Sequence, residues 1–252
     1  MKVALVTGAS AGIGQAAAFA IARAGVGVIT TYRSHGSEGE ATAARITAEG
    51  GRAVALPLDL GDVAGLDGFV EQVVGALSAT FGATRLDYLV NNAGIGGGLA
   101  FGEVTEEAFD RYERVLLRGP YFLTQKLLPV LADGGAIVNT GSTSALPNRV
   151  SAGYSVYAAL KGAVHTVTPY WAKELAPRRI RVNAVAPGTT RTRIGDDAFA
   201  RMPELIPAVA EGIALGRIGE PDDAAAIIAF LLSDAAAWVT GQVIEVSGGE
   251  RL

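Results

Sequence analysis

Two side chains that can exchange protons, Tyr157 and Lys161, stand four positions apart in a stretch without proline. On a helix, residues four apart share one face, so the phenol and the ammonium would lie side by side. A nearby ammonium favours the phenolate and lowers the tyrosine pKa, which suits proton transfer near neutral pH. The pattern Tyr-x-x-x-Lys is also a common chance match, with a plain surface pair as the alternative, so its meaning depends on the rest of the chain.

A glycine-rich turn, Thr7–Gly14, directly follows the first apolar stretch and precedes a helical one. Glycines let backbone amides approach a pyrophosphate, and the N-terminus of the following helix adds unpaired N–H donors. A tight structural loop is the alternative, but the position between a strand and a helix favours a dinucleotide site. The residues of this turn expected to bind the cofactor are Gly8, Ser10, Gly12, Ile13 and Gly14.

The end of the second expected strand carries Tyr32 and Arg33. The usual dinucleotide fingerprint has an acidic residue there, which binds the ribose hydroxyls. A guanidinium instead suits a 2′-phosphate by charge and geometry. Unless Arg33 is only a solvated loop charge, the sequence predicts that NADP(H) is favoured over NAD(H).

Short apolar runs alternate with helical stretches along the chain, which is typical of βαβ units. We therefore expect a single Rossmann-like α/β domain over residues 1–252, with about seven parallel strands and helices on both faces. The expected strands are Val3–Val6, Gly27–Thr31, Ala53–Leu56, Leu86–Val90, Ala136–Asn139, Ile180–Val185 and Val243–Val246. The expected helices are Gly12–Ala24, Glu40–Glu49, Leu66–Phe81, Glu106–Leu131, Tyr154–Leu175 and Asp222–Leu232. Thr189–Gly216, with two prolines and no strand, is expected to form a lid over the substrate.

Composition excludes several classes of function. The 252 residues carry a net charge of −4, so nucleic acid and membrane partners are disfavoured and a small molecule is expected. Cysteine is absent and there are only two histidines, so disulfides, thiol chemistry and a zinc site are not expected. Without a signal peptide or a long apolar run, the sequence predicts a cytoplasmic protein.

Several weak motifs occur in one consistent order. They are Thr7–Gly14, Asp59-Leu60, Asn91–Gly94, Ser142, Tyr157 with Lys161, Asn183–Gly188 with Thr192, and the stretch from Gly241 to Gly249. In this order the chain resembles the short-chain dehydrogenase/reductase family over nearly all its length, and in particular members like the 3-oxoacyl-carrier-protein reductases. The resemblance implies an NAD(P)-dependent oxidoreductase that interconverts a ketone and a secondary alcohol, assembled as a homotetramer or homodimer.

The resemblance also implies roles for the catalytic residues. The hydroxyl of Tyr157 would protonate the carbonyl oxygen as hydride arrives from the nicotinamide, and Ser142 would hold the same oxygen. Lys161 would bind the nicotinamide ribose and lower the tyrosine pKa. Ser144 stays open as an alternative to Ser142. Tyr154 is expected to line the substrate pocket with Ser142 and Tyr157.

The same resemblance implies contacts along the cofactor. Asp59 would accept a hydrogen bond from the adenine amino group, and Asn91 would support the adenosine ribose. Gly94 would let the chain pass close to the cofactor. The other residues implied in cofactor binding are Leu60, Ala93, Pro187, Gly188 and Thr192.

One residue departs from the family pattern. The family has a catalytic asparagine where this chain has Leu116, and leucine neither donates nor accepts a hydrogen bond. The water-mediated proton path through that asparagine must be rerouted or weakened, although we expect activity to survive. A cofactor-binding sensor or scaffold is therefore one alternative function.

A second alternative is an enoyl reductase, because Tyr154 stands seven positions before Lys161. The Gly12-Ile13-Gly14 pattern favours the carbonyl reductases instead. For a carbonyl substrate, we expect an uncharged, hydrophobic ketone, with a 3-oxoacyl thioester still open.

Overall fold

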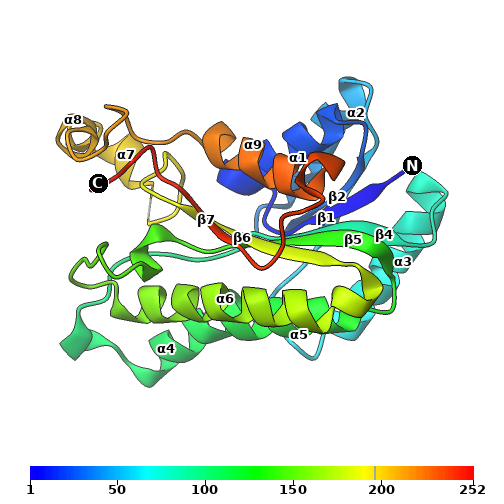
Figure 1. The fold of residues 1–252 in the computed structure, drawn as a ribbon, viewed down its shortest axis with the longest axis horizontal. Helices are drawn as coiled ribbons and strands as arrows, with labels where there is room; N and C mark the ends of the chain where they lie inside the picture. The colour runs from blue at the N-terminus through cyan, green and yellow to red at the C-terminus, as the bar shows by residue number, and fades with distance from the viewer. Residues whose placement is uncertain (196) are drawn as a thin grey trace.

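The computed structural model describes residues 1–195 and 197–252. Within them, seven parallel strands form one sheet in the order β3-β2-β1-β4-β5-β6-β7 (Figure 1). The strands are β1 Val3–Val6, β2 Gly27–Tyr32, β3 Ala53–Pro57, β4 Leu86–Asn91, β5 Leu131–Thr140, β6 Arg181–Pro187 and β7 Val243–Val246. The Rossmann-like α/β fold expected from the sequence is confirmed.

Helices cover both faces of the sheet (Figure 1). One layer holds α1 Gly12–Arg23, α2 Gly36–Ala48 and α9 Pro221–Leu232. The other holds α3 Leu66–Ala76, α4 Glu106–Glu113, α5 Gly119–Leu127 and α6 Ser155–Glu174. Successive residues of a strand point to opposite faces. Ala4 and Val6 accordingly belong to the core under α1 and α9, while Val3 and Leu5 belong to the core over α3 and α5. Both faces are apolar, which explains the continuous apolar runs of the strands.

The expected helix Glu106–Leu131 was wrong at its C-terminal end. The structure has α4, a π-helical turn Arg114–Arg118, and α5, which ends at Leu127. Pro129 follows, and because proline has no N–H to donate to the preceding turn, it favours a helix end at this point. Leu131 then begins β5 and is buried in the core. The π-helical turn contains Leu116, the residue that departs from the family pattern.

The C-terminal ends of the strands meet at one edge of the sheet, shown on the left of Figure 1. The segment Thr189–Gly216, which was expected to act as a lid, lies at this edge and contains two short helices, α7 Ala198–Arg201 and α8 Leu205–Ala210. Residue 196 of that segment lies outside the described residues. Ligands of parallel sheets bind beyond this edge, so the site is sought there.

In the described ranges, no helix combines the length and apolar character needed to cross a membrane. No three His, Cys, Asp or Glu side chains among those residues lie close enough together to hold a metal ion.

Candidate active site

The first turns of α6 bring Tyr157 and Lys161 to the strand ends. The Lys161 Nζ lies 5.8 Å from the centre of the Tyr157 ring. The same Nζ donates a 2.7 Å hydrogen bond to the carbonyl oxygen of Thr140, the last residue of β5. Only 5% of Lys161 is exposed, so its ammonium is fixed inside the protein. The pair that the sequence predicted on one helix face is therefore anchored to the central sheet.

Ser142 lies in extended backbone just after β5, before a 3₁₀ turn at Thr143–Ala145. Its Oγ accepts a hydrogen bond from the backbone N–H of Ser144 at 3.1 Å, and it also interacts with the phenol of Tyr157. Among the described residues, Ser144 forms no hydrogen bond with Tyr157. The structure thus joins Ser142, and not Ser144, to the tyrosine.

His165 supports the serine, a role that the sequence did not reveal. The backbone N–H of Ser142 donates to His165 Nε2 at 3.3 Å. A side chain at Gly141 would collide with the same imidazole ring. Burial, followed by the charge of Lys161, lowers the pKa of His165 and favours the neutral ring that can accept this bond. The only signal in the sequence was the position of His165, one helical turn after Lys161.

Burial governs the ionisation of the catalytic pair. Burial raises the pKa of Tyr157 to about 12, although the hydrogen bond with Ser142 lowers this pKa. Burial also lowers the pKa of Lys161 to about 8. The expected lowering of the tyrosine pKa by Lys161 was therefore wrong for the protein without ligand, because desolvation disfavours the phenolate more strongly. A phenol that keeps its proton near neutral pH is suited to act as an acid.

The glycine turn after β1 is packed against the end of β4. Gly8 has a φ of +65°, and a Cβ added there would lie 2.7 Å from the Cα of Ala93. Gly12 has a φ of +57° and its added Cβ would lie 3.3 Å from Thr192 Cγ2. Ser10 and Ile13, both half-buried, belong to the same turn. Such close approach leaves room for backbone and ligand but little for side chains.

The amide groups at the start of α1 remain available for an anion. No side chain caps this helix at Ala11, which lies in extended backbone. Uncapped N–H groups at a helix start favour phosphate. The turn therefore fits the pyrophosphate of a dinucleotide, as the sequence predicted.

Asn92 fixes the shape of this turn, a role that the sequence did not reveal. Its Nδ2 donates to the carbonyl oxygens of Thr7 at 3.0 Å and Gly8 at 3.2 Å. In return, Thr7 Oγ1 accepts the backbone N–H groups of Asn92 at 2.9 Å and Ala93 at 3.0 Å. The loops after β1 and β4 thus form one hydrogen-bonded unit. The signal was the doubled asparagine in Asn91–Gly94.

Asn91 has a different environment from the one expected. Its side chain is buried, and Nδ2 donates to Thr124 Oγ1 and to Asn139 Oδ1, each at 2.9 Å. Both amide protons are therefore used inside the protein. Support for a ribose is left to its backbone groups and Oδ1.

The adenosine end of the expected cofactor site is formed by the ends of β2 and β3. Tyr32 is half-buried, and its ring lies against Gly36 and Gly39 at the start of α2. Arg33 is exposed and has no hydrogen bond or ion pair with any described residue. Asp59 is also exposed and accepts the backbone N–H of Gly61 at 2.8 Å, while Leu60 is buried. A free guanidinium and a free carboxylate oxygen thus face solvent here.

The expected nicotinamide end of the cofactor site is the loop after β6. Pro187 is the last residue of that strand, and Gly188 and Thr192 follow it. A Cβ at Gly188 would lie 2.7 Å from Glu250 Oε2 and from Ser247 Cβ, so this loop is packed against the segment after β7.

Leu116 is buried between the π-helical turn and α6. It packs with Tyr112, Val156 and Leu160. A Cβ at Gly94 would lie 3.2 Å from Leu116 Cδ2 and 3.9 Å from Lys161 Nζ. The leucine methyl groups therefore fill the space beside the lysine.

A small cavity of about 20 Å³ lies next to Leu116, lined in part by Thr140 and Lys161. This volume is comparable to the space that one water molecule needs. The buried Thr140 Oγ1 has no hydrogen-bond partner among the described residues. The surroundings of Lys161 are therefore partly polar despite the leucine.

Tyr154 stands at the start of α6 on the open side of the site. Its ring is edge-on to that of Tyr157, with the two centres 6.3 Å apart. Tyr154 is 37% exposed. The backbone N–H of Leu99 donates to the carbonyl oxygen of Gly153 at 2.7 Å, so the loop that contains Leu99 lies beside Tyr154. Tyr154 is therefore an exposed aromatic side chain directly beside Tyr157.

Known proteins resemble this chain over nearly its whole length. A family profile described as enoyl-(acyl carrier protein) reductase matches residues 8–250. An uncharacterized oxidoreductase of Methylorubrum extorquens is 42% identical over 250 residues, covering 99% of this chain and 98% of that protein. The versicolorin reductase stcU of Emericella nidulans is 36% identical and covers 98% of this chain and 95% of its own.

Solved structures agree with these relatives. The reductase LugOII, which catalyses keto-reduction at C1 during lugdunomycin biosynthesis, has a TM-score of 0.94 at 38% identity, covering 100% of this chain and 98% of its own. The angucycline C-6 ketoreductase LanV, solved with bound NADP, has a TM-score of 0.92 at 38% identity, and the match covers 99% of this chain and 95% of LanV. LanV has also been solved with NADP and rabelomycin together.

The profile and the relatives lead to one family. LugOII and LanV are named for keto-reduction, and a relative from Sphingomonas that is 38% identical over 98% of this chain is named an L-rhamnose 1-dehydrogenase. The seven-stranded parallel sheet has the same fold as its solved neighbours. The chain therefore belongs to the short-chain dehydrogenase/reductase family and is an oxidoreductase of carbonyl and hydroxyl groups.

Proposed function

We propose that this protein is an NADP(H)-dependent oxidoreductase that interconverts a ketone and a secondary alcohol, with Tyr157 as its acid/base. The observation that carries the proposal is the meeting of Ser142, Tyr157 and Lys161 at the carboxyl edge of the sheet. Because Tyr157 interacts with Ser142 and lies beside a buried lysine, two hydroxyl donors are held together near one cation.

The chain's own groups would handle the proton and the negative charge. When bound, the cofactor supplies the hydride that reduces the carbonyl carbon. Tyr157 has a pKa of about 12 and is therefore protonated near neutral pH, and it would donate that proton to the carbonyl oxygen. Ser142 would donate to the same oxygen and hold it in place. Donors placed where negative charge develops stabilise the transition state more than the ground state.

The preference for NADP(H) rests on Arg33. Its guanidinium is exposed, stands at the end of β2, and has no partner among the described residues. An unpaired guanidinium at this position suits a 2′-phosphate, whose two oxygens match its fork of donors. NADP is also the cofactor bound in the LanV structure.

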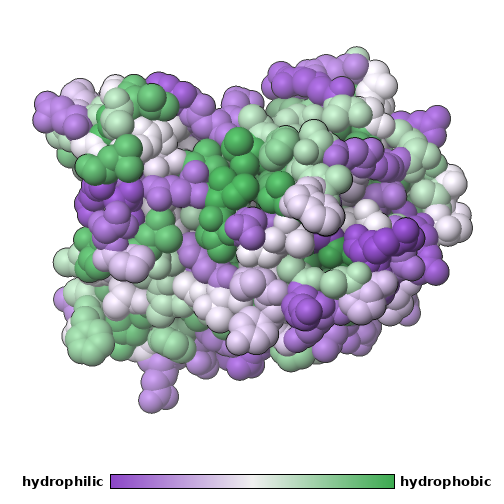
Figure 2. Space-filling view, in the orientation of Figure 1, coloured by the Kyte–Doolittle hydropathy of each residue, from purple (hydrophilic) through white to green (hydrophobic). Residues whose placement is uncertain are grey.

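For the substrate, we propose a hydrophobic ketone built on fused or aromatic rings. A relative from Zymoseptoria tritici, 34% identical, is named a probable tetrahydroxynaphthalene reductase, and LanV has been solved with rabelomycin bound. Apolar side chains are exposed on the loops beside the site, including Phe101 (87%), Val150 (78%) and Ile194 (48%). Figure 2 shows a hydrophobic area between the lobe of α7 and α8 and the layer of α1 and α9. Flat apolar rings would cover part of that surface.

We also propose that the protein assembles as a homotetramer or homodimer. Aromatic side chains are exposed on the outer faces of α5 and α6, where Tyr121 stacks edge-on with Phe122 and with Trp171. Light scattering after gel filtration tests this proposal, and a monomer at micromolar concentration would contradict it.

The function is tested by NADPH oxidation with a panel of cyclic and aromatic ketones. Wild-type protein is expected to turn over, and Tyr157→Phe to bind NADPH with unchanged affinity but to lose at least about a thousandfold in kcat. Tyr154→Phe is the matched control and should keep most of the activity. NADPH binding without turnover of any ketone by the wild type would favour a sensor instead. Loss of activity in Tyr154→Phe with survival in Tyr157→Phe would favour an enoyl-reductase arrangement.

A further inference from the structure

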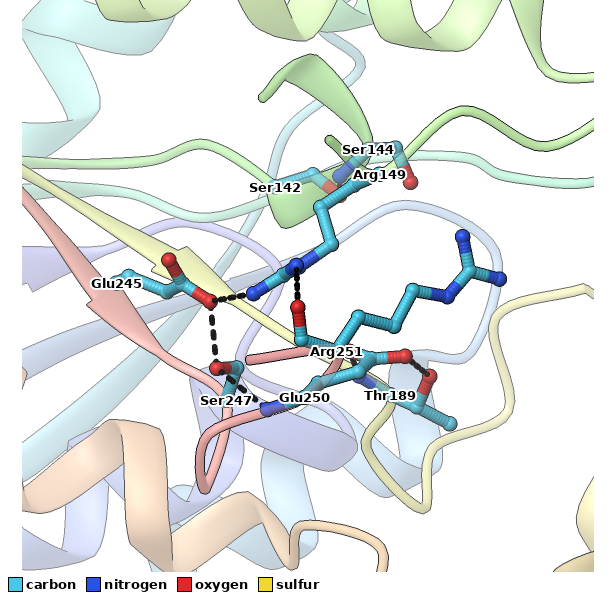
Figure 3. Close-up of polar contacts among 8 residues, drawn as sticks. All are labelled: Ser142, Ser144, Arg149, Thr189, Glu245, Ser247, Glu250 and Arg251. Carbon is cyan, nitrogen blue, oxygen red and sulfur yellow. Dashed lines mark hydrogen bonds and ion pairs between the residues drawn. The ribbon is translucent and has the colours of Figure 1, made fainter. Parts of the chain in front are cut away.

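The end of β7 and the segment that follows it touch both loops that form the walls of the proposed site. We define residues 245–251 as the bridge segment. On one side it contacts Arg149, in the loop between Ser142 and Tyr154, and on the other it contacts Thr189, two residues after the end of β6 (Figure 3). These two loops are distant in sequence, and each carries residues assigned to the site.

Arg149 is held inside the protein by the bridge segment. Its Nη2 donates to Glu245 Oε1 and its Nη1 to the carbonyl oxygen of Arg251, both at 2.9 Å. Only 5% of Arg149 is exposed, which is unusual for an arginine. A buried guanidinium that makes two defined hydrogen bonds fixes its own loop relative to Glu245 and Arg251.

Glu250 holds the opposite loop with both carboxylate oxygens. Its Oε1 accepts the hydroxyl of Thr189 at 2.8 Å, and its Oε2 accepts the backbone N–H of Thr189 at 3.1 Å. Thr189 follows Gly188, and the absence of a side chain at Gly188 makes room for the carboxylate of Glu250. The backbone leading to Thr192 is therefore fixed by an acidic residue from another part of the chain.

The two contacts are connected within the bridge segment itself. Ser247 Oγ donates to Glu245 Oε1 at 2.6 Å and accepts the backbone N–H of Glu250 at 3.3 Å. Figure 3 shows the resulting chain of polar contacts, which runs from Arg149 through Glu245, Ser247 and Glu250 to Thr189. The loop that contains Arg149 and the loop that contains Thr189 are thus held relative to each other by hydrogen bonds to charged groups.

We infer that Arg149 and Glu250 are positioning residues for the proposed reduction. Glu250 fixes the loop that receives the nicotinamide end of the cofactor, and Arg149 fixes the loop that receives the ketone. Neither needs to touch a reacting atom. The inference rests on the proposed function, because only that function assigns the two loops to cofactor and substrate.

The two residues predict different kinetic effects. Glu250→Gln replaces two charge-assisted hydrogen bonds to Thr189 with neutral ones of about half the strength, so NADPH should bind on the order of tenfold more weakly and kcat should fall. Arg149→Met should raise the KM for the ketone on the order of tenfold with a smaller change in NADPH affinity. Arg149→Lys keeps the charge and should recover part of the loss.

Binding of 2′,5′-ADP separates positioning from general damage. This ligand represents only the adenosine half of the cofactor, so Glu250→Gln should leave its dissociation constant unchanged while weakening NADPH. Glu71→Gln is the matched control, because Glu71 is exposed on α3 and has no partner among the described residues. NADPH affinity is measured by fluorescence, and kcat and KM by steady-state kinetics.

The outcomes distinguish the two proposals. A wild type that neither binds NADPH nor reduces any ketone overturns the proposed function, and the positioning role with it. A wild type that does both, with Glu250→Gln and Arg149→Met within twofold of it, overturns the positioning role alone. Equal weakening of NADPH and 2′,5′-ADP in Glu250→Gln would also overturn it, since the effect would then be on the fold.

Discussion

Lys161 Nζ donates a 2.7 Å hydrogen bond to the carbonyl oxygen of Thr140, which ties the catalytic helix α6 to the end of β5. The hydrogen bond fixes the lysine but does not compensate for its burial, because burial lowers the pKa of Lys161 to about 8 from 10.5. A cation held in a buried site costs free energy of folding whenever it is charged. The buried lysine of the proposed catalytic site therefore lowers the stability of this protein.

Lys161→Met should raise the stability of the ligand-free protein near neutral pH and abolish activity. Between about pH 8 and 10.5 the unfolded state binds more protons than the folded one, so wild-type stability rises with pH. The variant lacks this dependence. Its advantage in unfolding free energy should shrink by about 2 kcal/mol from about pH 6.5 to about pH 9.5. Urea unfolding at both pH values measures this change.

Lys173→Met is the control for this prediction, because Lys173 lies on the same helix but is exposed. Its stability difference from the wild type should not depend on pH. If the difference in unfolding free energy between Lys161→Met and the wild type is also the same at both pH values, burial does not lower the pKa of Lys161 in the folded protein.

Leu116→Asn should cost stability without restoring much rate. The leucine is 2% exposed and packs with Tyr112, Val156 and Leu160, so an amide there loses apolar contacts and needs new partners. We expect a loss of about 2–4 kcal/mol in unfolding free energy. The water-sized cavity beside Thr140 and Lys161 already offers polar surroundings, so kcat should stay within about threefold of the wild type.

Leu116→Ala separates the two effects, since it removes the same contacts without adding an amide. A kcat for Leu116→Asn that is more than about tenfold above that of Leu116→Ala would show that an asparagine relay controls the rate in this chain.

Arg33→Ala should reduce the preference for NADPH over NADH by on the order of tenfold or more in kcat/KM, almost entirely through the KM for NADPH. The guanidinium is exposed and free of protein partners, so its loss should not change the thermal midpoint. Arg52→Ala, another exposed arginine, provides the control. An unchanged cofactor ratio in Arg33→Ala would show that Arg33 is only a solvated charge.

Gly14→Ala should prevent cofactor binding or folding. Its added Cβ would collide with the side-chain amide of Asn92 and the carbonyl oxygen of Gly8, which join the two loops under the pyrophosphate site. Gly75 lies on α3 with open space around it. Gly75→Ala should therefore stabilise the protein by roughly 0.5–1 kcal/mol. NADPH titration and thermal unfolding of both variants test this contrast. Normal NADPH affinity in Gly14→Ala would contradict the close packing.

Sequence patterns predicted the sheet because its signals are local. Each strand contains a short apolar run, and the turn at Thr7–Gly14 and the pair Tyr157 and Lys161 are short motifs. The end of α5 was misplaced because the apolar residues before and after Pro129 follow one another without a polar break. Only the three-dimensional packing decides which of them belong to the helix and which to β5.

The supporting contacts of the site could not be read from sequence for a different reason. His165 lies 23 positions from Ser142, and Glu250 lies 61 positions from Thr189. Nothing in the spacing of such residues predicts that they meet. The raised pKa of Tyr157 likewise depends on burial by several elements, and so the nearby lysine alone suggested the wrong direction.

Ser142→Ala should reduce kcat by about a hundredfold or more, while Ser144→Ala should keep it within about threefold. The Ser142 hydroxyl interacts with Tyr157, whereas Ser144 contributes its backbone N–H to the Ser142 Oγ, and alanine keeps that N–H. The hydrogen bond with Ser142 also lowers the pKa of Tyr157, so its removal should raise the pKa of the phenol further and move the pH at which alcohol oxidation reaches its full rate to a higher value.

Steady-state rates in both directions measure these effects, with NADPH affinity as the test of an intact fold. Because Ser142 is not in the glycine turn, both variants should bind NADPH like the wild type. Ser144→Ala losing as much kcat as Ser142→Ala would move the serine role to Ser144, and the interaction with Tyr157 would then have to form only when substrate is bound.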